Sequence, residues 1–314
     1  MAASPALIKE LRERTGAGMM DCKRALEENN NDVSKAIDFL REKGLAAAAK
    51  KAGRIAAEGV CQVLVSEDGK KGVVVEVNCE TDFAANGEAF KEYVNQVAAQ
   101  ALASSTNDIN AFLEEKWSLD PTLTVKQALS TKIATIGENI NIRRFEKFEK
   151  STPGMFSTYV HGGGKIAVLL DVECDTVNDQ VKEAGKNACL QIAALIPKFI
   201  HSGEIPQDFL EKEKSILTAA ALNENKESEN PKPENVLENI IKGRFNKYLK
   251  EICLVDQEYV KDNSMTVGQY IDGVSKEVGS KITLSRFICF ERGEGIEKKE
   301  ENFAEEVAKV TGNL

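Results

Sequence analysis

Apolar residues recur at helical spacing in three runs near the N-terminus. Breaks at residues 15–18 and 29–31 separate the runs, and Gly44 is expected to end the third. The pattern predicts a compact three-helix bundle over residues 1–44. The Ala-rich, basic sequence of residues 45–58 is expected to link this bundle to the rest of the chain.

Two methionines, Met19 and Met20, follow the first of these breaks. They could form the small core of the bundle. Alternatively, they could form an exposed patch that contacts a partner, because methionine side chains adapt to irregular surfaces. The sequence leaves both interpretations open.

Beyond Gly59 the pattern changes from the helical period to that of strands. Two valine-rich runs, residues 59–66 and 72–79, flank a polar turn and predict a β-hairpin. A loop is expected at residues 80–87. The following pattern predicts helices over residues 88–104, 110–117 and 125–136 and a strand over residues 140–148.

A repeat relates the two halves of the chain. Residues 77–81 match 172–176 at an offset of 95, and residues 124–127 match 266–269 at an offset of 142. We therefore expect two related subdomains, residues 59–152 and 153–292, each with a hairpin, helices and a final strand. The predicted fold class is α+β.

The increase in the offset indicates an insertion in the second subdomain. Residues 204–262 contain two amphipathic helical stretches around a polar, proline-bearing tip, which predicts a projecting antiparallel helical hairpin. The acidic end of the chain, residues 293–314, has Phe303, Val307 and Val310 at helical spacing. It predicts a helical module that docks on the core or on a partner, because so short a helix is not stable alone.

One loop breaks the repeat. Asp82 and Phe83 stand where the second copy is expected to have Val177 and Asn178. Phe83 could pack beneath the following helix as a structural staple. Alternatively, Asp82 and Phe83 could form an exposed wedge, since aromatic anchors dominate the energetics of many protein interfaces.

Composition narrows the function classes. The 314 residues carry a formal net charge of -9, which disfavours a nucleic-acid binder that follows phosphates with a basic face. No apolar run is long enough to span a bilayer, and the N-terminus has no signal-peptide pattern, so the expected location is the cytoplasm.

Catalytic and metal-binding patterns are absent from the sequence. The seven cysteines include no CxxC pair and are expected to be reduced, buried side chains; there are only two histidines. Neither a phosphate-binding loop nor a GxSxG nucleophile motif occurs, and His161 opens a glycine-rich hairpin turn. We expect no enzyme activity, cofactor or metal.

Several long segments together resemble one family. The strings KELRERTGAGMMDCKRAL, KKAGRIAAEGV, EVNCETDFAAN, IATIGENINIRRF and GEGIEKKEENFAEEVA resemble bacterial elongation factor Ts, in the same order along the chain. The resemblance implies a guanine-nucleotide exchange factor for the GTPase elongation factor Tu. It also implies a UBA-like N-terminal bundle, two related core subdomains, a coiled-coil hairpin and a C-terminal module.

The resemblance also implies which residues contact the partner. The family's TDFV element, which displaces the magnesium bound with GDP on the GTPase, falls on Thr81, Asp82, Phe83 and Ala84. Ala84 replaces the family's valine, which would remove apolar contact if this position lies in the interface. Further implied contacts are Arg12, Met19 and Met20 in the bundle, His161 in the second subdomain, and Phe303 and Val307 in the C-terminal module.

Two other classes of function are weighed against this one. The first is an RNA-binding protein associated with translation, which the acidic composition disfavours. The second is a protein-interaction adaptor of the UBA type, built on the N-terminal bundle. That reading leaves residues 59–314 without a role.

Overall fold

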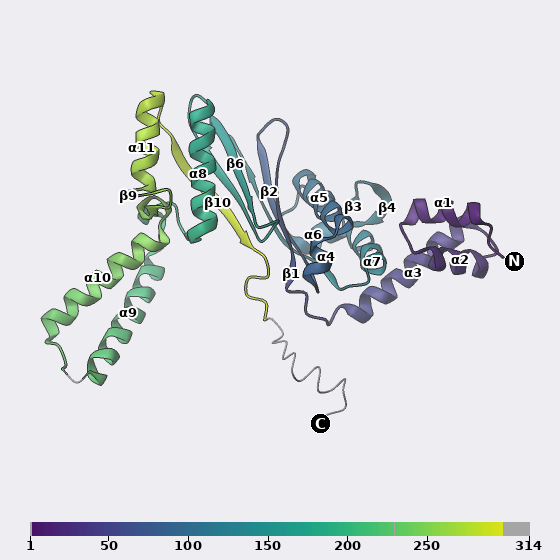
Figure 1. Cartoon of the computed structure of the whole chain (residues 1–314), viewed down its shortest axis with the longest axis horizontal. Helices are drawn as coiled ribbons and strands as arrows, with labels where there is room; N and C mark the ends of the chain where they lie inside the picture. The colour runs from purple at the N-terminus through teal and green to yellow at the C-terminus, as the bar shows by residue number, and fades with distance from the viewer. Residues whose placement is uncertain (1, 229, 298–314) are drawn as a thin grey trace.

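A bundle of three helices forms one end of an elongated molecule (Figure 1). The computed structural model describes residues 2–228 and 230–297. The bundle consists of α1 (Pro5–Thr15), α2 (Met19–Glu28) and α3 (Val33–Lys51), so the three predicted helices are present. Its fully buried side chains are Leu11, Cys22, Ala25, Leu26 and Ala36.

The third helix does not end at Gly44, and this prediction is wrong. α3 continues to Lys51, and its second half packs against α7 (Val125–Ile136) of the core. A Cβ atom on Gly44 would lie 3.6 Å from the carbonyl oxygen of Ser130, so the two helices approach closely here. This packing offsets the roughly 1 kcal/mol that a glycine costs inside a helix. The first part of the predicted linker is therefore helical.

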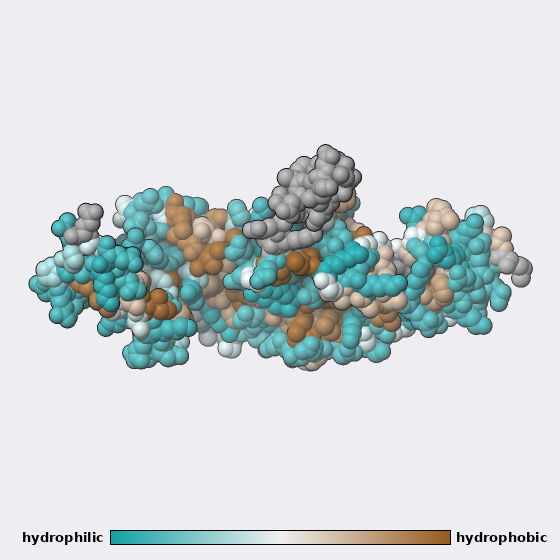
Figure 2. Space-filling model, turned by 90° about the horizontal axis from the view of Figure 1, so that it is seen from below, coloured by the Kyte–Doolittle hydropathy of each residue, from teal (hydrophilic) through white to brown (hydrophobic). Residues whose placement is uncertain are grey.

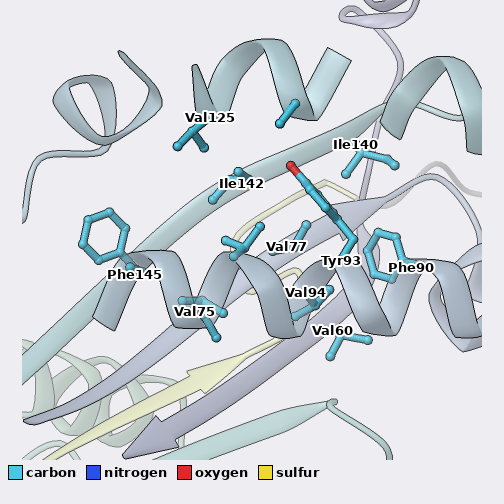
Figure 3. Packing of buried hydrophobic residues seen from close by; sticks show 14 of the residues in the cluster. Val60, Val75, Val77, Phe90, Tyr93, Val94, Val125, Ile140, Ile142 and Phe145 are labelled. Atoms are coloured by element: carbon cyan, nitrogen blue, oxygen red, sulfur yellow. The ribbon is translucent and has the colours of Figure 1, made fainter. Parts of the chain in front are cut away.

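The first core subdomain is a three-stranded antiparallel sheet with helices on one face. Its strands, β1 (Glu58–Val65), β2 (Lys71–Cys79) and β5 (Ile140–Glu149), lie in the order β1-β2-β5. α5 (Glu88–Ala103) packs on the sheet through Phe90, Tyr93 and Val94 (Figure 3). The predicted hairpin is confirmed. Between α5 and β5 the chain forms α6 (Ile109–Glu114), the small hairpin of β3 (Lys116–Trp117) and β4 (Asp120–Thr124), and α7.

The second subdomain repeats this arrangement. Its strands, β6 (Gly154–His161), β7 (Ile166–Glu173) and β10 (Thr283–Glu291), form a sheet in the order β10-β7-β6. The elements that correspond to α5, β3, β4 and α7 are α8 (Asp179–Leu195), β8 (Glu258–Tyr259), β9 (Asp262–Thr266) and α11 (Val267–Val278). Together with the bundle, these two subdomains confirm the α+β class.

Local geometry supports the repeat in detail. Thr124 and Thr266 each begin a helix with a complete capping box, in which the threonine and a glutamine three residues later bond each other's backbone. Gly59 and Gly154 both have φ above 130°, and a Cβ on either would lie 2.1 Å from a carbonyl oxygen of the neighbouring strand. Both positions therefore require glycine.

The two sheets pack against each other through their faces that carry no helices. Arg144 lies over the ring of Phe290 at 4.1 Å, and its counterpart Arg286 lies over the ring of Phe148 at 4.2 Å. Each arginine comes from one subdomain and each ring from the other, so the contact is reciprocal. The apolar side chains between the sheets are Cys61, Val74, Phe148, Ala167, Leu169, Ile288 and Phe290.

This interface contains a buried carboxylate, Glu76, which is 0% exposed. It accepts hydrogen bonds from Arg143 at 3.0 Å, Arg144 at 2.6 Å and the backbone N–H of Gly293 at 2.8 Å. Burial alone would raise the pKa of Glu76, but these donors and the bond from Asn78 together hold the pKa below its usual value.

The repeat also corrects the predicted alignment of the wedge. Gln100 of α5 and Gln191 of α8 are buried, and each bonds the backbone of the following small hairpin in the same way. Their offset is 91, four less than the offset between the preceding strands. Asn178, which caps α8, therefore corresponds to Gly87 and not to Phe83. Phe83 lies in an insertion that the second copy lacks.

The second subdomain has its own insertion, a projecting helical hairpin (Figure 1). Its arms are α9 (Gln207–Glu227) and α10 (Glu234–Ile252), as the two apolar stretches predict. The predicted bounds, residues 204–262, are too wide, because β8 and the start of β9 belong to the repeated fold. Tyr259 of β8 is buried in the core of the second subdomain.

The cysteines behave as predicted from their apolar surroundings. Six are buried and Cys289 is partly buried, and none forms a disulfide. Burial raises the pKa of Cys189 to about 12. In the part of the chain that the structure describes, no helix combines the length and apolar character needed to cross a membrane.

Candidate partner-binding site

The segment predicted as a loop contains a short helix, α4 (Asp82–Asn86), so this part of the prediction is wrong. The side-chain oxygen of Thr81 caps the helix by accepting a hydrogen bond from the N–H of Ala84 at 3.1 Å. Gly87 ends α4 and begins α5 without a break. The local cause is the threonine cap, which the loop prediction did not consider.

Phe83 is 87% exposed at the surface of α4. It does not pack beneath the following helix, so the staple interpretation is wrong. Asp82, the first residue of the helix, is exposed as well. An exposed phenylalanine on an ordered helix has the properties of an anchor that is buried only when a partner binds.

Ala84 faces the opposite way. It is 9% exposed and, with Ala85, belongs to the hydrophobic core of the first subdomain. Its methyl group therefore anchors α4 to the body of the protein. A valine here would add volume to this core, so the expected loss of interface contact through Ala84 does not follow from the structure.

A carboxylate that the sequence analysis did not select holds the start of α4. Glu138 lies between α7 and β5 and accepts three hydrogen bonds from Glu80 and Thr81. The repeat contains a signal for it, because Ser280 occupies the corresponding position at the offset of 142. A difference of this kind between the copies is harder to recognise in the sequence than a matching string.

A groove brings the start of α4 close to the predicted site in the second subdomain. It is lined by Thr81 and Asp82 on one side and by Gly162, Gly163 and Lys165 of the β6–β7 turn on the other. His161 begins this turn, is exposed, and has its Nδ1 atom 3.1 Å from the hydroxyl of Tyr159. The two subdomains thus contribute adjoining surfaces.

The remaining described candidates lie on the N-terminal bundle, at one end of the molecule (Figure 1). Met19 and Met20 are 59% and 66% exposed, which resolves the open question in favour of a surface patch. Arg12 is exposed on α1. The molecular surface seen from below is mostly hydrophilic, with separate apolar patches on the bundle and on the body (Figure 2).

Two predicted contacts, Phe303 and Val307, lie outside the described residues, as does most of the predicted C-terminal module.

Cys79, at the end of β2, donates a weak bond to the carbonyl oxygen of Thr81, and burial raises the pKa of its thiol to about 12. It is therefore a neutral thiol at pH 7 and a poor nucleophile. Among residues 2–228 and 230–297, no three His, Cys, Asp or Glu side chains are grouped to hold a metal ion.

Comparison with known proteins identifies the family. The family model for elongation factor Ts matches residues 80–294. An elongation factor Ts of Clostridium perfringens is 52% identical over 305 residues, covering 97% of this chain and 98% of the relative. Those of Clostridium novyi and Clostridium acetobutylicum are 51% and 48% identical, with 96% and 98% of this chain and 97% of each relative covered. The chain therefore belongs to the elongation factor Ts family of translation elongation factors.

Proposed function

We propose that the chain is a guanine-nucleotide exchange factor, which binds the GTPase elongation factor Tu in its GDP-bound form and promotes release of GDP. GTP can then bind the empty site. The observation that carries this proposal is the exposed Phe83, presented on a capped helix beside a groove between the two subdomains.

In this proposal Asp82 and Phe83 act as the wedge that displaces magnesium and disturbs the phosphate site of the GTPase. Magnesium neutralises phosphate charge, so its loss raises the repulsion within a bound nucleotide. Thr81 and Ala84 support the wedge, because one caps α4 and the other is buried beneath it. No covalent chemistry is required of this chain.

Further contacts are proposed from other parts of the molecule. The exposed Met19 and Met20, with Arg12, suit a UBA-like bundle that docks on the partner. His161 would contact the partner from the second subdomain. Phe303 and Val307 would contact it from the C-terminal module. The hairpin of α9 and α10 would be a coiled coil that projects from this assembly.

Thermodynamic linkage constrains the mechanism. If the factor weakens GDP binding to the GTPase, GDP weakens binding of the factor by the same ratio. Each tenfold weakening needs about 1.4 kcal/mol of differential interaction. A wedge that moves magnesium and phosphate ligands can supply several such units, because it competes directly with the bound nucleotide.

Stopped-flow release of fluorescent GDP from elongation factor Tu tests the proposal. The chain is expected to accelerate release in the presence of magnesium. The acceleration should be smaller in EDTA, because the metal is then already absent. Release that is unchanged by the chain in magnesium would refute the exchange function. An equal acceleration in both solutions would refute the role of magnesium displacement.

A further inference from the structure

The helix that carries Phe83 cannot hold its position by its own stability. α4 has five residues, well below the roughly 12 to 15 at which an isolated helix becomes marginally stable. The ring of Phe83 is exposed and contributes little burial. Ala84 and Ala85 are buried but small. α4 also packs on β1 and β2 and leads directly into α5, and contacts of the residues that precede it complete its placement.

Glu138 supplies these contacts. Its Oε2 atom accepts hydrogen bonds from the backbone N–H groups of Glu80 and Thr81, each at 3.1 Å. Its Oε1 atom accepts a third from the hydroxyl of Thr81 at 2.6 Å. One carboxylate thus holds both residues that precede α4. Hydrogen bonds to a charged group are stronger than those between neutral groups.

The third bond also determines how Thr81 caps the helix. A threonine hydroxyl has one proton to donate and two lone pairs that accept. Because the proton is donated to Glu138, a lone pair is directed to the N–H of Ala84, 3.1 Å away. Glu138 therefore acts on α4 through the orientation of this hydroxyl.

In a second set of bonds the donor is Asn139, the residue that follows Glu138. The backbone N–H of Asn139 donates to Oε1 of Glu80 at 2.6 Å. The buried side chain of Asn139 donates to the carbonyl oxygen of Arg54 at 2.7 Å. The turn before β5 and the segment before α4 are therefore joined by reciprocal contacts.

The second subdomain lacks both parts of this arrangement. Ser280 and Lys281 occupy the positions of Glu138 and Asn139, and no helix stands between β7 and α8. The scaffold folds without the carboxylate in that copy. Glu138 is thus associated with α4 and not with the shared sheet.

We propose that Glu138 is a positioning residue for nucleotide exchange: it holds Thr81, and through it α4, so that Phe83 has one orientation before the partner arrives. Such preorganisation lowers the entropy lost on binding. This inference rests on the proposed exchange function.

The first test is the rate of GDP release from elongation factor Tu. Glu138→Gln keeps the shape but leaves one accepting oxygen for three donors. We expect the stimulated release to slow by about tenfold, the scale of losing a charge-assisted bond. The matched control is Glu277→Gln, an exposed carboxylate of α11 bonded to Gln180, which should leave release unchanged.

A mutant cycle separates positioning from general destabilisation. In the Phe83→Ala background no ring remains to be positioned, so Glu138→Gln should change release by less than about twofold. An equal slowing in both backgrounds, or none in either, would overturn the proposal. Thr81→Val should reproduce the slowing caused by Glu138→Gln, because it removes the hydroxyl that Glu138 orients. This variant decides the matter if Glu138→Gln does not fold.

Hydrogen exchange tests the contact without the partner. The amides of Glu80, Thr81 and Ala84 should exchange faster in Glu138→Gln, while those of α8 stay unchanged. Unchanged protection at these three amides would refute the positioning role. If the wild-type chain does not accelerate GDP release, the exchange function fails, and with it the functional part of this inference, whereas hydrogen exchange still decides the structural part.

Discussion

The two core subdomains share a sheet order, paired capping boxes and paired buried glutamines, but each carries a different insertion. In the first, the four extra residues before α5 form most of a small helix that exposes Phe83. In the second, α9 and α10 extend from the body as a long hairpin. The shared parts bury side chains, and the differing parts present them. The comparison therefore separates scaffold from candidate function.

The largest effects are expected where the two copies meet. Glu76→Ala leaves Arg144 without its buried partner, and Asp171→Ala does the same to Arg286 and Lys150. Each should lower the free energy of unfolding by about 3 kcal/mol, the scale of breaking a buried ion pair. Urea denaturation followed by circular dichroism measures both. A large loss of stability for one variant and none for the other would show that the two ion-pair clusters do not contribute equally to the interface.

Acid should weaken the same interface. The pKa of Glu76 is lower in the folded protein than its usual value of 4.5, so its contribution is fully present above that pH. It is lost as the pH falls through the lower folded pKa. Glu76→Gln should therefore lower the melting temperature at pH 7. The difference in melting temperature from wild type should become smaller as the pH falls through the folded pKa of Glu76. A constant difference at every pH would contradict this assignment.

Phe83→Ala should reduce function and leave the scaffold intact. Hot-spot truncations cost about 2 kcal/mol or more, which corresponds to a slowing of GDP release of at least about tenfold. Stability should change by less than about 1 kcal/mol, against 3 to 5 kcal/mol for a core phenylalanine. Asp82→Ala should act in the same direction.

The control for this prediction is Val177→Ala, which alters a partly exposed side chain between β7 and α8 in the second copy. It should leave GDP release unchanged. Unfolding of Phe83→Ala with a normal release rate per folded molecule would show that the ring is structural after all.

These sites differ in how far the sequence predicts them. The capping boxes of Thr124 and Thr266 are local, since each threonine bonds a residue three positions away. The repeat can therefore be recognised from the sequence. The four-residue change in the repeat offset before α5 is recognised from Gln100, whose hydrogen-bond partners lie 16 and 18 residues further along the chain. Glu138 accepts a hydrogen bond from Thr81, which lies 57 residues earlier in the chain. Non-local contacts of this kind leave no periodic pattern, so the sequence alone neither aligns the wedge correctly nor reveals the role of Glu138.

A smaller effect on stability is expected in the hydrophobic core of the first subdomain, where this copy buries the hydroxyl of Tyr93. The hydroxyl of Tyr93 has no hydrogen-bond partner among the described residues, and the ring lies in the hydrophobic core of the first subdomain (Figure 3). The corresponding residue of α8 is Ala184. Tyr93→Phe should stabilise the protein by about 1 kcal/mol, because it removes an unpaired buried hydroxyl. Destabilisation in thermal unfolding would indicate a partner such as an internal water.

The smallest effect is expected from shortening the hairpin. Its base is held by Phe199, Phe209, Tyr248 and Leu249 around the buried Ile252, whereas Ala221 and Leu237 are the buried side chains of the part of its outer arms that the structure describes. Replacing residues 214–245 by a short Gly-Ser linker keeps this base, together with Gln257 and Tyr259 of the repeated fold. Because the outer part of the hairpin projects away from the body (Figure 1), the remaining core should unfold cooperatively within a few degrees of wild type. The rate of GDP release should also stay unchanged.

Deletion of all of residues 204–262 should instead unfold the second subdomain, since it removes the buried Gln257 and Tyr259. Loss of cooperative unfolding in the shorter deletion would show that the hairpin is part of the scaffold and not an addition to it.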